Sequence, residues 1–184
     1  INSENDQLCP LTYYGYSKLA MEEFLKFSSR IYPINHLIVR PSNPYGSGQN
    51  LFGKQGLITV ALGKILQDQP IEIWGDGQVV RDYLHIRDLS NAIQALVAKG
   101  VDNQVYNIGS GQGHSVNEIV KIIHKVTERN TGVEYKPARP VDVPVNILSI
   151  DKINHHTGWK PEVNLEVGIA MLWKAMQQNV QRIK

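Results

Sequence analysis

Residues 10–48 read PLTYYGYSKLAMEEFLKFSSRIYPINHLIVRPSNPYGSG and predict a helix, a buried strand and an ordered loop in succession. The helix is expected over residues 12–31, and Pro33 ends it. The strand is the short apolar run HLIVR, residues 36–40, and the Gly-, Pro-, Ser- and Asn-rich residues 41–56 are typical of a surface loop. The apolar positions of the helix include Leu19, Phe24, Leu25 and Ile31.

The rest of the chain alternates helices with short strands. We expect, in chain order, a helix over 57–67, a strand over 71–74, a turn at 75–77, an extended stretch over 79–85, a helix capped by Asp88 and reaching about residue 99, and a strand over 105–108. Then follow a helix opened by the capping box Ser115–Glu118, extended pieces at 133–135 and 148–150 around a Pro-rich loop, and a last helix capped by Asn164. This alternation predicts an α/β architecture.

Composition excludes several classes of protein. The 184 residues carry a net charge of +2 from 19 basic and 17 acidic side chains, which is too balanced for a nucleic-acid surface or a polybasic membrane surface. No apolar run approaches the roughly 20 residues that span a bilayer. The single cysteine, Cys9, predicts a reducing compartment, so we expect a cytoplasmic protein. Because Ile1 is neither an initiator Met nor part of a signal peptide, we expect a fragment.

Tyr14 and Lys18 are the first pair of residues that predicts chemistry. Residues four apart share one face of a helix, so the Lys18 ammonium is expected near the Tyr14 hydroxyl. A nearby cation favours a phenolate, which makes Tyr14 a general-base candidate for an alcohol. On spacing alone the pair equally fits an exposed tyrosine beside a solvated lysine.

Polar and aromatic residues at strand ends suggest a ligand site. Asn43 follows a strand in RPSNPYGSG, where it can bond a phosphate or a sugar, although the same residues also build a plain turn. Trp74 and Arg81 flank a Gly turn and offer an aromatic face and a phosphate-binding fork, with a core aromatic and an ion pair to Asp82 or Asp88 as the alternatives.

A second arginine lies in the Pro-rich loop, in RPVD. With Arg81, Arg139 would place two guanidiniums around a diphosphate, and Asp142 would accept from ribose hydroxyls; a surface ion pair is the alternative. The six histidines form no metal pattern, and for His155 and His156 we expect solvated or capping roles.

The order and spacing of these motifs together resemble a known family. The segments are PLTYYGYSKLAMEEF, RPSNPYG, IEIWGDGQVVRDYLHIRDL, VYNIGSGQGHSV, RPVD and TGWKP. The chain resembles the NAD-dependent epimerase/dehydratase group of the extended short-chain dehydrogenases/reductases, most closely its UDP-glucose 4-epimerases. The resemblance implies the C-terminal part of a Rossmann-type doubly wound sheet plus a small α+β lobe. It implies that residues 1–56 end the dinucleotide-binding domain, and that residues 57–184 are mainly the nucleotide-sugar lobe.

The resemblance also implies roles for individual residues. Tyr14 and Lys18 would be catalytic and contact the nicotinamide ribose of NAD, with Ser42 beside the cofactor. The nucleotide-sugar contacts, with a UDP-sugar as the expected ligand, would come from Asn43, Glu72, Ile73, Trp74, Arg81, Tyr83, Arg139, Asp142 and Asn146. Asn146 falls where the family limits the size of the C2 substituent of the sugar.

The sequence departs from the family pattern in two ways. No G-x-x-G-x-x-G follows a strand, and the Ser or Thr of the catalytic set would precede Ile1. We therefore expect the isolated chain to be inactive, to bind no measurable NAD and to form a homodimer through the helix 12–31. The intact protein is expected to be an epimerase, with a dehydratase or decarboxylase, or a non-catalytic nucleotide-sugar-binding module, as the alternatives.

Overall fold

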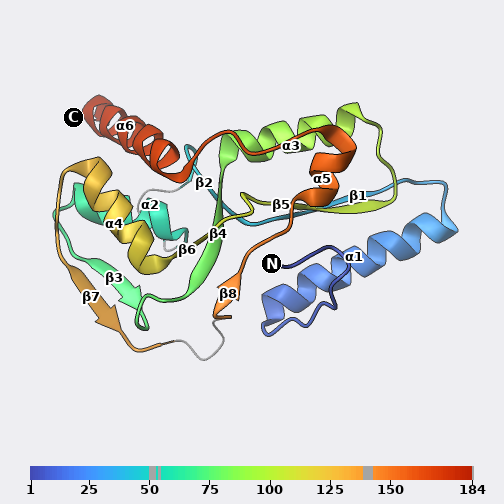
Figure 1. The fold of residues 1–184 in the computed structure, drawn as a ribbon, viewed down its shortest axis with the longest axis horizontal. Coiled ribbons are helices and arrows are strands. Elements are labelled where there is room, and N and C mark those ends of the chain that lie inside the picture. The colour runs from blue at the N-terminus through green and yellow to red at the C-terminus, as the bar shows by residue number, and fades with distance from the viewer. Residues whose placement is uncertain (50–52, 54, 139–142, 184) are drawn as a thin grey trace.

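The chain adopts a mixed α/β fold in which short parallel strands are covered by helices. The computed structural model describes residues 1–49, 53, 55–138 and 143–183. Figure 1 shows two groups of elements on either side of the long strand β4 (Val80–His85). Within the described residues no helix is both long and apolar enough to cross a membrane.

The first group is built on two parallel strands. β1 (Leu37–Pro41) pairs in register with β5 (Gln104–Ile108), so that Arg40 lies opposite Asn107. Helix α3 (Ile86–Ala98) lies on one side of this pair and α1 (Tyr13–Ile31) on the other, as Figure 1 shows. The core beneath α3 and the short helix α5 (Asp151–Thr157) consists of Leu84, Ala92, Leu96, Tyr106, Ile108, Ile153 and Trp159.

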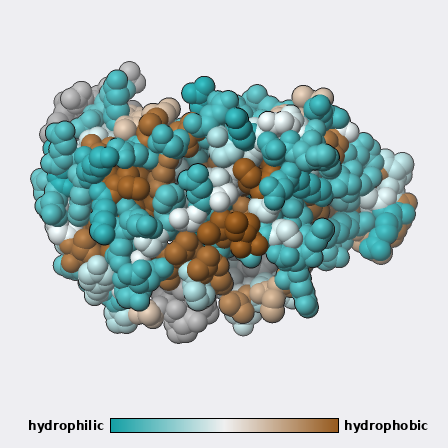
Figure 2. Space-filling view, in the orientation of Figure 1, coloured by the Kyte–Doolittle hydropathy of each residue, from teal (hydrophilic) through white to brown (hydrophobic). Residues whose placement is uncertain are grey.

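Helix α1 contributes little to the core. Ser28 is its one buried residue, whereas Met21, Phe24, Leu25 and Phe27 are exposed. Among the described residues β1 pairs with β5 alone, so no described strand pairs with its other edge. Figure 2 shows one face of the whole molecule, on which hydrophobic residues form separate patches within a largely hydrophilic surface.

The second group packs helices against another parallel strand pair. β3 (Ile71–Trp74) runs beside β7 (Val133–Lys136), and α2 (Leu57–Leu66), α4 (Val116–Thr127) and α6 (Leu165–Ile183) complete the layer. Its core consists mainly of Ile58, Leu62, Ile65, Ile71, Ile73, Ile119, Ile123, Ile169, Leu172, Trp173 and Met176.

Strand β4 joins the two groups. It pairs with β2 (Asn43–Tyr45), β6 (Gly113–Ser115) and β8 (Val145–Asn146). Because successive side chains of a strand point to opposite faces, Tyr83 belongs to the α2–α4–α6 core and Leu84 to the α3–α5 core. One residue step along β4 therefore separates the two hydrophobic cores.

Most predicted elements are confirmed to within a few residues. The capping box is present, with Ser115 Oγ accepting from Glu118 N at 3.2 Å and Glu118 Oε2 accepting from Ser115 N at 2.7 Å. Asn164 Oδ1 accepts from Val167 N at 2.9 Å at the start of α6. These features depend on residues three apart, which is why the sequence predicts them.

The predicted cap at Asp88 was wrong. His85 caps α3 by accepting from Arg87 N at 3.3 Å, and Asp88 is buried in the first turn. The Asp88 carboxylate instead accepts from Val163 N at 2.9 Å, a partner 75 residues away that no local pattern contains.

The expected extended piece at 148–150 is also corrected. Leu148 forms only an isolated bridge with Asn2, and Ile150 is already the N-cap of α5. The short strands β2, β6 and β8 were not predicted, because two or three residues are too few to show a period.

Candidate functional site

An open cavity of about 1120 Å³ lies between α1 and the β3–β4 region. Nine of the residues singled out in the sequence line it: Tyr14, Lys18, Ser42, Asn43, Glu72, Ile73, Trp74, Arg81 and Tyr83. They come from α1, the end of β1, and strands β2, β3 and β4. Tertiary structure therefore brings the proposed catalytic pair and the proposed nucleotide-sugar contacts onto one cavity wall.

Tyr14 and Lys18 lie in the first turns of α1. Thr12 caps the helix by accepting from Gly15 N at 3.0 Å, which fixes where its first turn begins. The Lys18 ammonium lies 5.2 Å from the centroid of the Tyr14 ring, within the range of a cation–π contact. Tyr14 is 73% exposed, so its hydroxyl is accessible to a bound molecule.

Ser42 and Asn43 lie where β1 passes into β2. Ser42 N donates to Ile108 O at 2.9 Å, while its hydroxyl is buried and has no hydrogen-bond partner among the described residues. Asn43 Nδ2 donates to the backbone oxygen of Asp82 at 2.8 Å, which holds the asparagine against β4. A buried hydroxyl without a partner is costly, so the Ser42 hydroxyl is suited to a ligand that supplies one.

Strand β3 alternates buried and exposed side chains. Ile71 and Ile73 are buried, whereas Glu72 and Trp74 are exposed. At 45% exposure Trp74 is not the core aromatic of the alternative interpretation, and its ring is accessible for stacking. The Glu72 carboxylate lies 3.8 Å from the Lys64 ammonium and forms a long, partly exposed ion pair with it.

Arg81 and Tyr83 occupy one face of β4. The Arg81 guanidinium donates to Val143 O at 2.6 Å and to Val80 O at 2.9 Å. Burial raises the pKa of Tyr83 to about 12, an effect that the positive charge of Arg81 opposes, so Tyr83 stays a neutral hydroxyl at neutral pH.

Asp82 and Asp88 bind backbone and hydroxyl groups. They do not form the ion pair with Arg81 that was the alternative interpretation. The buried Asp82 carboxylate accepts from Ser110 N at 2.8 Å, Ser110 Oγ at 2.7 Å and Gly111 N at 3.2 Å. It therefore organises the loop after β5 on the face opposite Arg81.

Of the three remaining predicted contacts, Asn146 alone is among the described residues. Arg139 and Asp142 fall outside the described residues. Asn146 does not line the cavity; it lies opposite Arg81 in the β4–β8 register, and its Oδ1 accepts from Asn2 Nδ2 at 2.8 Å. Its role toward the sugar stays a prediction.

All six histidines lie in the described part of the chain. Within the described ranges no group of three or more His, Cys, Asp or Glu side chains is arranged to hold an ion. His156 is not merely solvated, because its Nδ1 lies 2.6 Å from the Tyr106 hydroxyl.

An ion pair that was not predicted from the sequence lies in the cavity wall. Glu22 of α1 and Arg40 of β1 both border the cavity, and Arg40 binds both carboxylate oxygens of Glu22. The spacing of Lys18 and Glu22, four residues apart, was the available signal for Glu22; no local signal joins Glu22 to Arg40.

Comparison with known proteins assigns this chain to a family. A model of the NAD dependent epimerase/dehydratase family matches residues 2–109. The chain is 38% identical over 177 residues to a Methanocaldococcus jannaschii protein provisionally named UDP-glucose 4-epimerase, covering 96% of this chain and 57% of that protein. It is 34% identical to dTDP-4-dehydro-6-deoxyglucose reductase of Escherichia coli, covering 95% and 55%.

A solved structure shows the same fold. UDP-glucose 4-epimerase from Thermotoga maritima, crystallised with UDP-glucose, superposes with a TM-score of 0.93 at 32% identity, over 97% of this chain and 58% of that one. The fold is accordingly α/β of the Rossmann type, as the resemblance implied. The chain spans a little over half the length of these relatives. Because the family model covers more than half of its residues, the chain belongs to the NAD dependent epimerase/dehydratase family.

Proposed function

We propose that this chain is the nucleotide-sugar side of an NAD-dependent 4-epimerase acting on a UDP-hexose or UDP-N-acetylhexosamine. The observation that carries the proposal is the single cavity that Tyr14 and Lys18 share with Trp74 and Arg81. A general-base candidate lies at one part of its wall, and an aromatic ring and a guanidinium lie at another. This combination suits a ligand with an alcohol to be oxidised, a diphosphate and a base.

The residues present fit one end of NAD. The buried Ser42 hydroxyl without a partner and the Tyr14–Lys18 pair border the same cavity, and they would hold the nicotinamide ribose. When bound, NAD would accept a hydride from the sugar and return it. The sequence has no glycine-rich pyrophosphate turn, so residues outside this chain would bind the rest of the cofactor.

The chain's own residues would then divide the work. Tyr14 would take the proton from the sugar hydroxyl and later give it back, while the Lys18 cation stabilises the phenolate. Arg81 would neutralise the diphosphate, and Trp74 would stack on the base. Arg139 and Asp142 would add a second guanidinium and a ribose acceptor. We place residues 1–56 with the dinucleotide-binding domain and most of residues 57–184 with the nucleotide-sugar lobe.

Two further assignments follow from this proposal. Asn146 is smaller than an aromatic side chain, so an N-acetyl group at C2 of the sugar would be tolerated. A homodimer through α1 would cover its exposed apolar residues, and the protein would work in the cytoplasm.

A related dehydratase or reductase is the second function within the same family. The similarity to the Escherichia coli reductase favours it. The dehydratase shares its first oxidation with the epimerase, and the reductase transfers a hydride at a keto sugar. The same cavity would therefore suit all three reactions. The third hypothesis is that the chain is a non-catalytic nucleotide-sugar-binding module.

The test is an assay of the full-length protein with NAD. UDP-glucose, UDP-N-acetylglucosamine and dTDP-glucose are each incubated with it, and products are separated by chromatography. The proposal expects the C4 epimer of at least one substrate. A 6-deoxy-4-keto product from dTDP-glucose would favour the dehydratase, and binding without turnover of either sugar would favour the module.

A further inference from the structure

The cavity-lining face of α1 offers Lys18 two competing partners. Tyr14 precedes it by four residues, Glu22 follows it by four, and all three side chains border the cavity. Side chains four apart on a helix are neighbours, and oppositely charged ones attract. A Lys18 ammonium drawn to the Glu22 carboxylate would move away from the phenol ring.

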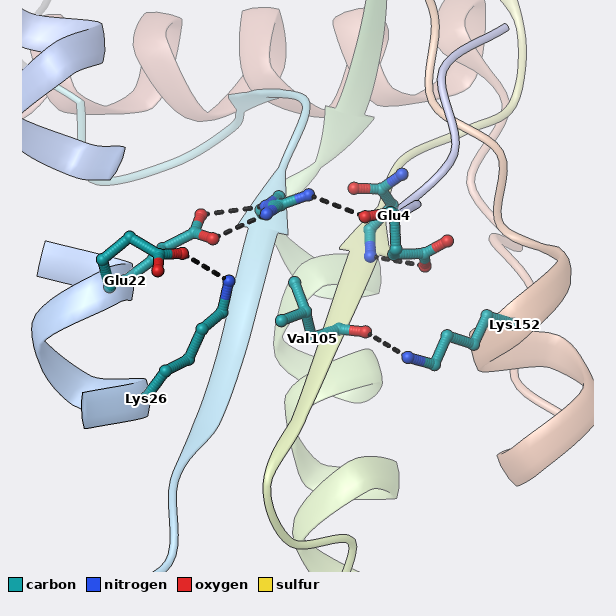
Figure 3. A network of polar contacts seen from close by, with 8 residues as sticks. Glu4, Glu22, Lys26, Val105 and Lys152 are labelled. Carbon is teal, nitrogen blue, oxygen red and sulfur yellow. Dashed lines mark hydrogen bonds and ion pairs between the residues drawn. The ribbon is translucent and has the colours of Figure 1, made fainter. Parts of the chain in front are cut away.

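In the structure Lys18 stays with Tyr14. Its ammonium lies 5.2 Å from the centroid of the Tyr14 ring. The Glu22 carboxylate is bound by Arg40 instead, with Nε to Oε1 at 2.9 Å and Nη2 to Oε2 at 2.6 Å. Figure 3 shows Glu22 directed from α1 toward β1. The side chains of Arg40 and Glu22 are only 17% and 14% exposed, so water screens the pair weakly.

Arg40 is itself held in place from the other side. Its backbone lies in β1 opposite Asn107 of β5, and its Nη1 donates to the backbone oxygen of Glu4 at 3.4 Å. The Glu4 carboxylate in turn accepts from Asn107 N at 2.9 Å, on the β5 side of the network in Figure 3. The guanidinium therefore meets Glu22 from a fixed position.

We propose that Arg40 is a positioning residue that occupies both oxygens of Glu22 and thereby keeps Lys18 at Tyr14. A planar guanidinium can satisfy both oxygens of a carboxylate at once, whereas an ammonium acts as a single point charge. Arg40 thus acts on the reacting centre through Glu22 and Lys18 without touching the substrate. The inference rests on the proposed function insofar as Tyr14 and Lys18 are its catalytic pair.

The kinetic test uses three variants of the full-length enzyme: Arg40→Met, Glu22→Gln and the double variant. Arg40→Met is expected to lower kcat by about 10- to 100-fold, within the range of a general base, and to change KM for the nucleotide sugar by less than about 3-fold. Glu22→Gln is expected to lower kcat far less, because it removes the competing charge. The double variant is expected to recover at least about 5-fold of the loss caused by Arg40→Met.

A purely structural tie between α1 and β1 predicts the opposite pattern. Glu22→Gln would then harm kcat as much as Arg40→Met, and the double variant would be no better than either; that pattern would overturn the proposal. Glu23→Gln is the matched control, since Glu23 pairs with Lys26 at 2.8 Å on the same helix outside the cavity lining. If Arg40→Met does not fold, Arg40→Lys replaces it, and the test is whether Glu22→Gln raises kcat on that background or lowers it.

A crystal structure of the Arg40→Met variant provides a readout independent of activity. The proposal expects the Lys18 ammonium within about 4 Å of a Glu22 oxygen and away from the Tyr14 ring. Lys18 remaining at Tyr14 would refute the inference whatever the enzyme's reaction. Absence of epimerase activity in the wild type would refute only the proposed function.

Discussion

The Lys18 ammonium lies over the Tyr14 ring, 5.2 Å from its centroid, on helix α1, which borders the cavity. This contact places a cation against a tyrosine whose hydroxyl is accessible. The predictions for catalysis below rest on this contact between Lys18 and Tyr14.

Tyr14→Phe in the full-length enzyme is expected to lower kcat by at least about 100-fold, because the proton then has no acceptor at that position. Affinity for the nucleotide sugar should be nearly unchanged, since the hydroxyl acts when the proton moves. Steady-state kinetics and calorimetry with UDP-glucose measure the two quantities. Tyr13→Phe is the control, because Tyr13 is 97% exposed and does not line the cavity. Equal activity of the two variants would contradict the assignment.

Arg81→Ala is expected to weaken UDP binding. Losing one charge-assisted hydrogen bond costs about 1.5–3 kcal/mol, or about 10- to 150-fold in Kd. Calorimetric titration of the full-length protein with UDP measures this. Arg87→Ala is the matched control, because Arg87 is exposed and absent from the cavity lining. Unchanged affinity in Arg81→Ala would remove Arg81 from the site.

Phe24→Asp is expected to convert a dimer into a monomer. Phe24 is exposed beside Met21 and Leu25 on α1, and a charge there would be buried without a partner in a symmetric interface. Sedimentation velocity at two protein concentrations measures the change. Val97→Asp, at an exposed apolar position of α3, serves as the control. A wild type that sediments as a monomer at both concentrations would rule out the dimer.

Stability should fall in mild acid partly because of His85. Burial lowers the pKa of this ring below its ordinary 6.5, outweighing the opposing effect of Asp88, and the buried ring packs edge-on to Tyr45. The unfolded chain therefore binds a proton at a higher pH than the folded one. The free energy of unfolding therefore decreases as the pH falls below about 6.5.

His85→Asn is expected to reduce this pH dependence, because asparagine can also cap α3 but does not titrate. Urea unfolding at about pH 7.5 and pH 5 measures the free energy of unfolding of both proteins. His124, whose pKa burial also lowers, is present in both and cancels in the comparison. Equal losses of stability in the two proteins would show that His85 does not contribute.

The sequence by itself determined the features that depend on neighbouring residues. The strand Ile71–Trp74, the capping box Ser115–Glu118 and the common helical face of Tyr14 and Lys18 all follow from short, regular spacings. Local backbone geometry fixes which side chains lie together over two to four residues, so such patterns are legible without a fold. The motif order was specific enough to indicate the family.

Only the tertiary structure decided which distant groups meet. The Asp82 carboxylate accepts hydrogen bonds from Ser110 and Leu148, which are 28 and 66 residues away. Asp88 binds Val163 and does not cap α3. The Arg40–Glu22 pair likewise joins a strand to a helix 18 residues earlier. A buried carboxylate needs hydrogen-bond donors, and these come from whichever segments pack against it. Local sequence patterns do not predict which distant segments those are.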